Sequence, residues 1–250
     1  MSLDNWLTAL DERHLADLTP SEVARALRAL SSCYVERREK LERGGPLDSA
    51  GKRAAFALFY GPLHFIVTRE VVRALPGGEE GLEHVVDLGC GTGSAGAAWA
   101  LEGRDTRITG FDRNLWAVAE ANWTYRTLGI PGRAAKQDIE QATIRSGPGA
   151  GVLAAYAVNE LPDEIRAALL PRLVAAHAQG ARVLIIEPIA RRQARWWNTW
   201  QKTFIAAGGR ADEWRFRAAL PDRQRSLARA AGLDPRELTA RSLFLGSDVP

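Results

Sequence analysis

Hydrophobic positions follow two different rhythms along the chain. Up to about residue 78 they recur at helical spacing, as Val23, Leu27 and Leu30 do. From residue 84 onwards, short apolar runs of strand type alternate with helical segments. Strands that alternate with helices indicate a parallel sheet with helices on both faces. The pattern therefore predicts an N-terminal helical extension, or lid, over residues 1–78 and an α/β domain over residues 79–250.

The helical extension carries clear start and stop signals. Thr19 can cap a helix, Pro20 suits its first turn and Glu22 can close a capping box. The two glycines and the proline of residues 44–46 predict a break. A second helical stretch is expected over residues 54–75.

The α/β part contains six segments that we expect to be strands. They are residues 84–88, 107–112, 133–138, 151–158, 182–188 and 238–245. Residues 189–220 interrupt the alternation, and we treat them as a basic, tryptophan-rich insertion. A helix over residues 223–231, which Gly232 ends, precedes the last strand.

The insertion interleaves basic and aromatic side chains. The residues are Arg191, Arg192, Arg195, Lys202, Arg210, Arg215 and Arg217, with Trp196, Trp197, Trp200 and Trp214. Such a mixture can grip phosphates and stack bases. It can equally form a helical cover whose tryptophans pack on the sheet while the arginines reach water. The helical spacing of Trp196 and Trp200 favours the cover, and either role places the segment near a substrate.

A glycine-rich turn follows the first expected strand directly. Asp87 ends this strand, and glycines stand at positions 89, 91 and 93. Glycines let such a turn fold tightly, and the next helix offers free N–H groups to a ligand. Asp112 ends the second strand about 20 residues later, the spacing at which an acid can accept hydrogen bonds from a ribose.

Two cofactors compete for this turn. Gly91, Gly93 and Gly96 form the G-x-G-x-x-G fingerprint of dinucleotide sites, which suits an NAD-dependent oxidoreductase. However, a pyrophosphate would be repelled by Asp87, whereas the cationic amino-acid end of S-adenosylmethionine would be attracted. The turn also follows a long helical segment, whereas dinucleotide fingerprints often open the chain. In addition, residues 230–233, which precede a terminal strand, match the end of a methyltransferase domain. These features favour S-adenosylmethionine.

Residues 84–250 resemble class I S-adenosylmethionine-dependent methyltransferases. The resemblance rests on the turn of residues 87–93, on Asp112, on Asp138 after the third strand and on the C-terminal pattern of residues 227–245. It implies a Rossmann-like seven-stranded sheet whose last strand is antiparallel and lies between two parallel strands.

The resemblance also implies roles for individual residues. The methionine end would be lined by Asp87, Gly89, Gly91 and Gly93, the ribose would be bound by Asp112 with Arg113 beside it, and the adenine would be contacted by Asp138 and Ile139. A narrower resemblance, over residues 58–75 and 158–162, is to the methyltransferase-like proteins of the mitochondrial small ribosomal subunit and their bacterial relatives. Those proteins often carry metal-ligating cysteines, which this chain lacks.

Candidate catalytic residues follow the fourth strand. Asn159 or Glu160 could orient a nucleophile or take its proton, although the same residues could simply form a loop and helix cap before Pro162. Tyr156 could pack on the cofactor. His64 could face the active site, but a structural role is the simpler interpretation.

Composition narrows the class of protein. With 46% hydrophobic and 25% charged residues and a net charge of +3, the chain of 250 residues is an ordinary globular protein. It has no apolar run of transmembrane length and no signal pattern, so we expect a cytoplasmic protein. Cys33 and Cys90 have no C-x-x-C partners, and we expect no bound metal.

These observations lead to one main hypothesis and two alternatives. We expect a methyltransferase that transfers a methyl group in line to an acceptor held between the N-terminal helices, the Asn159 loop and residues 189–220. The acceptor could be RNA, a protein or a small molecule. The alternatives are an assembly factor that binds the rRNA of the small ribosomal subunit with little or no catalysis, and the NAD-dependent oxidoreductase.

Overall fold

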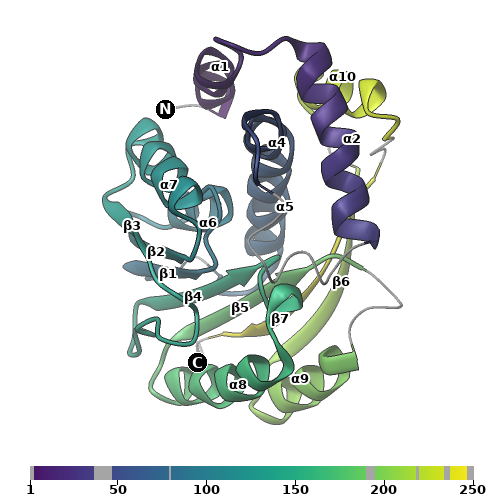
Figure 1. The fold of residues 1–250 in the computed structure, drawn as a ribbon. Coiled ribbons are helices and arrows are strands. Elements are labelled where there is room, and N and C mark those ends of the chain that lie inside the picture. Colours follow the sequence, from purple (N-terminus) through teal and green to yellow (C-terminus); the bar gives the residue numbers. More distant parts are fainter. Residues whose placement is uncertain are drawn as a thin grey trace. The chain divides into compact units, whose positions relative to one another are not determined.

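The computed structural model describes residues 3–36, 47–78, 80–189, 195–217, 220–233 and 237–246. The chain divides into two compact units, whose elements are drawn in Figure 1. The first contains residues 1–64 and 217–238, and the second contains residues 65–216 and 239–250. The break predicted at residues 44–46 lies outside the described residues. The division into residues 1–78 and 79–250 stays a prediction.

The first unit is helical. Its elements are α1 (Leu3–His14), α2 (Pro20–Glu36), α4 (Ala50–Ala55), the π-helical turn η1 (Phe56–Tyr60), the start of α5 (Gly61–Ala74) and α10 (Asp222–Ala230). The predicted capping box is confirmed: the backbone N–H of Thr19 donates to Oε2 of Glu22 at 2.8 Å, and the N–H of Glu22 donates back to Oγ1 of Thr19 at 3.3 Å. Val23, Leu27 and Leu30 are fully buried, as their spacing predicts.

Helix α10 joins these helices from the other end of the sequence. It contacts α2 and η1. Pro62 has no N–H to donate to the carbonyl four residues earlier, that of Leu58. Nε2 of Gln224 donates to this carbonyl at 3.0 Å instead. Residues 222–230 therefore belong to the helical unit, which the sequence pattern did not predict.

The second unit contains a seven-stranded sheet of order β3-β2-β1-β4-β5-β7-β6. The strands are β1 (His84–Leu88), β2 (Arg107–Asp112), β3 (Gly132–Lys136), β4 (Ala150–Ala155), β5 (Arg182–Glu187), β6 (Arg210–Phe216) and β7 (Leu238–Leu245). The first five pair in parallel, and β7 is antiparallel to β5. Because β7 lies between β5 and β6, the implied methyltransferase sheet is confirmed.

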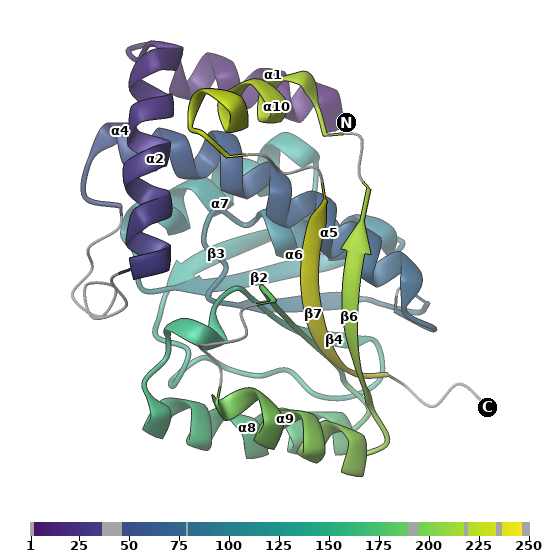
Figure 2. The same ribbon diagram turned by 90° about the vertical axis from the view of Figure 1, so that its right-hand side faces the viewer.

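Helices cover both faces of this sheet, as Figure 2 shows. One side carries α6 (Ser94–Glu102) and α7 (Leu115–Leu128), and the other carries α8 (Asp163–Ala178) and α9 (Arg195–Ala206). No helix connects β3 to β4 in the described chain, where residues 137–149 form irregular backbone. The short turn η2 (Val158–Glu160) links β4 to α8.

Residues 189–220 are not an interruption of the fold, so that prediction was wrong. They contain α9 and the sheet's edge strand β6, which the sequence pattern missed because its charged and aromatic residues alternate without a long apolar run. Trp197, Trp200 and Phe204 are buried and belong to the core between α9 and the sheet. These tryptophans therefore have the predicted covering role. Arg191, Arg192 and the side chain of Arg195 lie outside the described residues.

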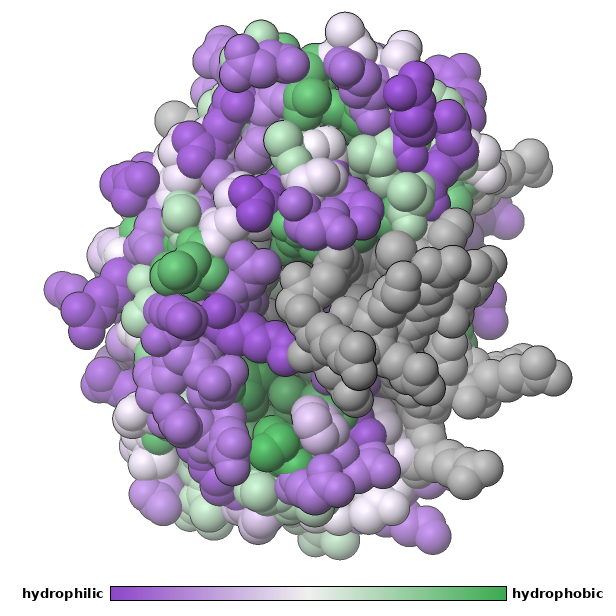
Figure 3. All heavy atoms as spheres, in the orientation of Figure 1, coloured by the Kyte–Doolittle hydropathy of each residue, from purple (hydrophilic) through white to green (hydrophobic). Residues whose placement is uncertain are grey.

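The surface seen in Figure 3 is mostly hydrophilic, and its hydrophobic residues form small separate groups. Among the described residues, the large hydrophobic side chains that are exposed lie on three different helices: Leu101 on α6, Leu115 on α7 and Ile205 on α9. None of the helices within the described ranges combines the length and the apolar character needed to span a bilayer.

Candidate functional site

The predicted site residues lie where four neighbouring strands end. Strands β3, β2, β1 and β4 are adjacent and parallel, so their carboxyl ends meet at one edge of the sheet. This edge is where open α/β sheets bind their ligands. The residues that end or follow these strands are Asp87, Gly89, Gly91, Gly93, Asp112, Arg113, Asp138, Ile139, Tyr156, Asn159 and Glu160.

The glycine turn after β1 needs its glycines. Gly89, Gly91 and Gly93 have φ of 71°, 52° and 78°, in the left-handed region that other residues rarely adopt. The N–H of Gly89 donates to the carbonyl of Phe111 at 2.8 Å, which ties the turn to β2. At Gly93, a Cβ would lie 2.7 Å from Cε1 of Tyr125 and 3.0 Å from Cα of Ala121. The backbone conformation at all three positions and the close packing at Gly93 therefore require glycine.

Gly96 explains why the turn resembles a dinucleotide fingerprint. Its N–H donates to Oδ2 of Asp87 at 3.1 Å, and a Cβ there would lie 2.4 Å from the same oxygen. The third glycine of the pattern thus makes room for a buried carboxylate. A pyrophosphate site has no use for such an acid.

Asp87 lies beneath the turn with 1% of its surface exposed. Desolvation raises the pKa of this carboxyl to about 7, although the N–H of Gly96 acts in the opposite direction and the negative charge of Asp112 adds to the rise. Through Gly96 the carboxylate is bonded to the first turn of α6. Its position fits the predicted role of orienting the turn.

Asp112 connects the end of β2 to both neighbouring loops. Its Oδ2 accepts from the N–H of Gly91 at 2.9 Å, and its Oδ1 accepts from the N–H of Asn114 at 2.8 Å. Desolvation raises the pKa of Asp112, and these two N–H groups and the charge of Arg113 partly oppose the rise. Asn114 caps α7, accepting from the N–H of Trp116 at 2.9 Å. Each carboxylate oxygen retains a second lone pair for a ligand.

The loop after β3 carries Asp138 and Ile139. Asp138 is exposed, and its charge acts on the carboxyl of Asp112. The Cδ1 of Ile139 would lie 3.2 Å from a Cβ placed on Gly89. The side chain of Ile139 therefore packs against the glycine turn.

Tyr156 follows β4 in an unusual conformation. Its φ of 58° is rare for an aromatic residue and costs on the order of 1–3 kcal/mol. Its N–H still donates to the carbonyl of Ile186 at 2.8 Å, so the β4–β5 pairing continues through it. Burial raises the pKa of the Tyr156 phenol, which stays protonated.

Asn159 is held by a buried carboxylate that the sequence analysis overlooked. Glu187 ends β5 and is fully buried; its Oε1 accepts from the N–H of Asn159 at 3.0 Å and its Oε2 from Nδ2 at 2.5 Å. In turn, Nε1 of Trp196 donates to Oδ1 of Asn159 at 3.1 Å. Hence the side chain of Asn159 links β5 to α9, while the neighbouring Glu160 is partly exposed.

Glu187 has an environment that favours its neutral form. Desolvation raises the pKa of its carboxyl to about 8, the backbone N–H of Asn159 and the charge of Arg241 oppose the rise, and the charge of Glu160 adds to it. Arg241 lies opposite in the β5–β7 register, with its guanidinium 4.0 Å from the centre of the Trp197 ring. An acid that ends an apolar strand, as Asp87 and Asp112 do, was the signal that could have identified Glu187.

His64 belongs to the first unit. Its ring lies 6.1 Å from the rings of both Phe56 and Tyr60. Desolvation lowers the pKa of His64 to about 3, so the imidazole is neutral at ordinary pH. This environment fits the structural role.

The chemistry of the strand ends fits S-adenosylmethionine better than a dinucleotide. Three neighbouring strand ends carry acids, Asp87, Asp112 and Asp138, which suit a ligand with an ammonium, a sulfonium, a ribose and an adenine amino group. They do not suit a pyrophosphate. Across the described ranges, no group of three or more His, Cys, Asp or Glu side chains could hold a metal ion.

Comparisons with known proteins agree with this architecture. Residues 85–180 match a family model described as a methyltransferase domain. The solved structure of the mitomycin 7-O-methyltransferase MmcR is similar with a TM-score of 0.53 and 16% identity, covering 96% of this chain and 72% of that one. At that identity the likeness shows a shared fold. A search of curated proteins finds no match to the sequence.

Two further solved structures are similar at lower scores. Magnesium protoporphyrin IX methyltransferase (ChlM) from Synechocystis PCC 6803 with bound SAM has a TM-score of 0.49 and 18% identity, covering 93% of this chain and 99% of that one. The Pyrococcus abyssi tRNA (uracil-54, C5)-methyltransferase in complex with S-adenosyl-L-homocysteine has a TM-score of 0.45 and 14% identity, covering 72% and 38%. The order and directions of the seven strands give the chain the fold of a class I methyltransferase, and residues 85–180 carry the sequence pattern of a methyltransferase domain.

Proposed function

We propose that the protein is an S-adenosylmethionine-dependent methyltransferase. The observation that carries the proposal is the pair of carboxyls around the glycine turn, of which Asp87 is buried and Asp112 is partly exposed. Asp87 accepts from Gly96 beneath the turn, and Asp112 accepts from Gly91 at its rim. This arrangement places acids on both sides of a turn that a phosphate ligand would need to be electropositive.

Each part of the cofactor has residues that suit it. The glycine turn with Asp87 would hold the methionine end, Asp112 would accept from the ribose hydroxyls, and Asp138 with Ile139 would contact the adenine. Tyr156 lies at the end of β4 beside the turn and would pack on the cofactor.

Methyl transfer asks little acid–base chemistry of the chain. When bound, S-adenosylmethionine supplies an activated methyl group, and holding the acceptor in line can lower the barrier by roughly 7–11 kcal/mol. Asn159 is engaged with Glu187 and Trp196, so its contribution would be to fix the loop after β4. The partly exposed carboxylate of Glu160 would be the group that accepts a proton from the acceptor.

Titration calorimetry with the whole chain tests the cofactor assignment. S-Adenosylmethionine and its demethylated product should bind at micromolar concentrations, and NAD should not. Asp112→Asn should weaken the binding of S-adenosylmethionine and of its demethylated product. Glu164→Gln, at an exposed position on α8, should leave both affinities unchanged. Binding of NAD without either sulfur compound would overturn the proposal.

An activity screen then identifies the acceptor class. Labelled methyl donor is offered with rRNA, protein extract and metabolite pools in parallel, and Glu160→Gln serves as the variant expected to slow transfer. Co-sedimentation with small ribosomal subunits addresses the alternative of an assembly factor. Label in none of the pools, together with co-sedimentation, would favour that alternative.

A further inference from the structure

The loop between β3 and β4 has an unusual construction for a parallel sheet. Residues 137–149 form no helix, so no regular ladder satisfies their carbonyl groups. Buried or half-buried carbonyls need donors from elsewhere. The loop carries Asp138 and Ile139, and how it is held therefore bears on the cofactor site.

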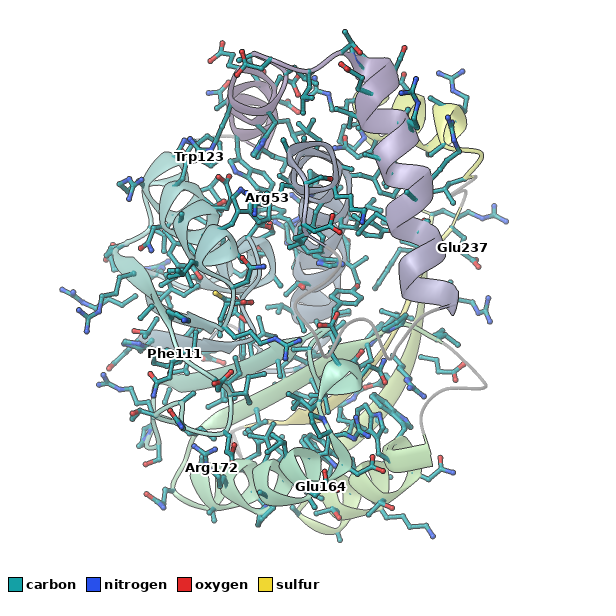
Figure 4. The ribbon with its side chains drawn as sticks, viewed as in Figure 1. Arg53, Phe111, Trp123, Glu164, Arg172 and Glu237 are labelled. Carbon is teal, nitrogen blue, oxygen red and sulfur yellow. The ribbon has the colours of Figure 1, made fainter. Side chains whose placement is uncertain are left out.

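One arginine on α8 donates to three of these carbonyls. Nη1 of Arg172 donates to the carbonyls of Ile139 at 3.3 Å and Glu140 at 2.8 Å, and Nη2 donates to that of Ala142 at 2.5 Å. Arg172 lies on α8, as Glu164 does (Figure 4). A planar guanidinium presents several donors in a fixed fork, which a lysine cannot do.

Two further carbonyls of the loop accept from donors within it. Gln141 donates its N–H to the carbonyl of Asp138 at 3.0 Å, and Nε2 of Gln137 donates to that of Gln141 at 2.7 Å. Every carbonyl from residue 138 to residue 142 therefore has a donor. For Glu140 and Ala142 that donor is Arg172, whereas the carbonyl of Ile139 accepts both from Arg172 and from the N–H of Ala142 at 3.2 Å.

The same loop is fixed to the glycine turn at its other side. Ala142 is fully buried in the core of the sheet, and Ile139 packs on that core. Because Cδ1 of Ile139 also lies against Gly89, a displacement of the loop would change the packing against the glycine turn. The contacts run continuously from Arg172 through the loop backbone to the residues expected to face adenine.

We propose that Arg172 is a positioning residue for the adenine end of the cofactor site: it fixes the loop backbone so that Asp138 and Ile139 face the base. This inference rests on the proposed function, since it presumes an adenine-bearing cofactor. Arg172 touches no ligand in this scheme and acts through the loop alone.

The test compares two ligands that differ only in the base. S-Adenosylhomocysteine carries adenine, and S-inosylhomocysteine carries hypoxanthine, which has a carbonyl oxygen in place of the amino group that Asp138 would accept from. Calorimetry on the wild-type chain should show roughly tenfold tighter binding of the adenine compound. In Arg172→Met the affinity for S-adenosylhomocysteine should fall roughly tenfold, and the preference between the two bases should shrink to about twofold.

Control variants separate positioning from stability. Arg133→Met removes an exposed arginine from β3 and should leave both affinities unchanged. Arg172→Lys keeps the charge and the aliphatic stem but loses the fork, so its base preference should fall between those of wild type and Arg172→Met. A thermal midpoint and a circular dichroism spectrum for each variant show whether it is folded.

A double-mutant cycle with Asp138→Ala tests the route of the effect. If Arg172 acts through the loop, the loss in the double variant should be clearly smaller than the product of the two single losses. Hydrogen exchange should also be faster over residues 137–142 in Arg172→Lys, a measurement that remains informative if the methionine variant does not fold.

Each outcome bears on the proposal. A wild-type chain that binds neither homocysteine compound overturns the proposed function, and the inference falls with it. A wild-type chain that binds them without a base preference overturns the inference alone. So does a folded Arg172→Met or Arg172→Lys that keeps the wild-type affinity and base preference, or a cycle in which the two losses multiply.

Discussion

The glycine turn after β1 and the loop after β4 border the same edge of the sheet but are held in different ways. The turn depends on its left-handed glycines and on Gly96, which is close in sequence and bonded to Asp87, in addition to its bonds to the neighbouring strand β2. The loop is fixed by side chains from distant elements, Glu187 at the end of β5 and Trp196 on α9. A local arrangement leaves a sequence signature, and an arrangement of distant side chains leaves almost none.

This difference predicts how substitutions in the glycine turn and in the loop after β4 destabilise the protein. Substitutions in the turn should act through backbone strain and overlap, and they should be hard to repair. Substitutions in the loop after β4 should act through one side-chain network, so a complementary change elsewhere should repair them.

Among the single substitutions, the largest effect is expected at Gly93. Gly93→Ala places a Cβ at φ 78° and 2.7 Å from Cε1 of Tyr125. Left-handed strain and overpacking together should lower the free energy of unfolding by about 3 kcal/mol, as measured by urea denaturation. Gly129→Ala is the matched control, since its φ is 72° but nothing lies within 4 Å of the added Cβ. It should cost about 1 kcal/mol, and equal losses in the two variants would contradict the packing argument.

A smaller effect is expected at Asn159. Asn159→Asp replaces the amide that donates to Glu187 with a second acid, and should cost about 2 kcal/mol. The double variant Asn159→Asp with Glu187→Gln restores a donor facing an acceptor, with the two groups exchanged. It should recover at least half of the lost free energy of unfolding. No recovery would show that the network is not what holds the loop.

The buried acids predict a dependence of stability on pH. The pKa of Asp87 is raised to about 7 and that of Glu187 to about 8, from ordinary values of 3.8 and 4.5. Between about pH 5 and pH 8 the folded chain therefore holds protons that the unfolded chain has lost. The free energy of unfolding should fall as pH rises through this window, by at most about 1.4 kcal/mol per pH unit for each group.

Glu187→Gln isolates one of these two contributions. Its free energy of unfolding should change less steeply between pH 5 and pH 8 than that of the wild type, in urea titrations at matched salt. A slope equal to that of the wild type would mean that Glu187 is ionised in the folded chain.

The smallest effect is expected at the cap of α7. Asn114→Ala removes the side-chain oxygen that accepts from the N–H groups of Trp116 and Ala117, and should cost about 1 kcal/mol. Asn114→Ser keeps a capping oxygen and should lose less. If the two variants lost the same stability, the side-chain oxygen of Asn114 would not be what caps α7.

The sequence predicted those parts of the fold that depend on local patterns. The strands β1, β2, β4, β5 and β7 are short apolar runs, and the Thr19 capping box is a local signature. Strand β6 was missed because it is an edge strand whose charged residues alternate with aromatic ones. Helix α10 was recognised as a helix, but its membership of the helical unit depends on long-range contacts such as that of Gln224 with Leu58.

The residues of the candidate site likewise divide into those that a local sequence pattern predicts and those that depend on long-range contacts. The acids and glycines at the strand ends were predictable because a strand that ends in an acid and a glycine turn is a contiguous pattern. Glu187 shares part of that pattern, yet its bond to Asn159 follows only from the pairing of β4 with β5. The contact of Trp196 with Asn159 and those of Arg172 with the β3 loop have no local signal, since they join elements that meet only in the folded chain.

Helix α8 donates hydrogen bonds to the backbone carbonyls of two loops, so these bonds do not depend on which side chains the loops carry. Arg172 donates to the carbonyls of Ile139, Glu140 and Ala142, and Arg166 donates to those of Val158 and Leu161. Every residue type offers the same carbonyl, so these bonds place no demand on what Glu140 or Leu161 is. The loops on this side of the sheet can thus differ in sequence, or be redesigned to accept another substrate, while Arg166 and Arg172 of one helix keep their backbones in place.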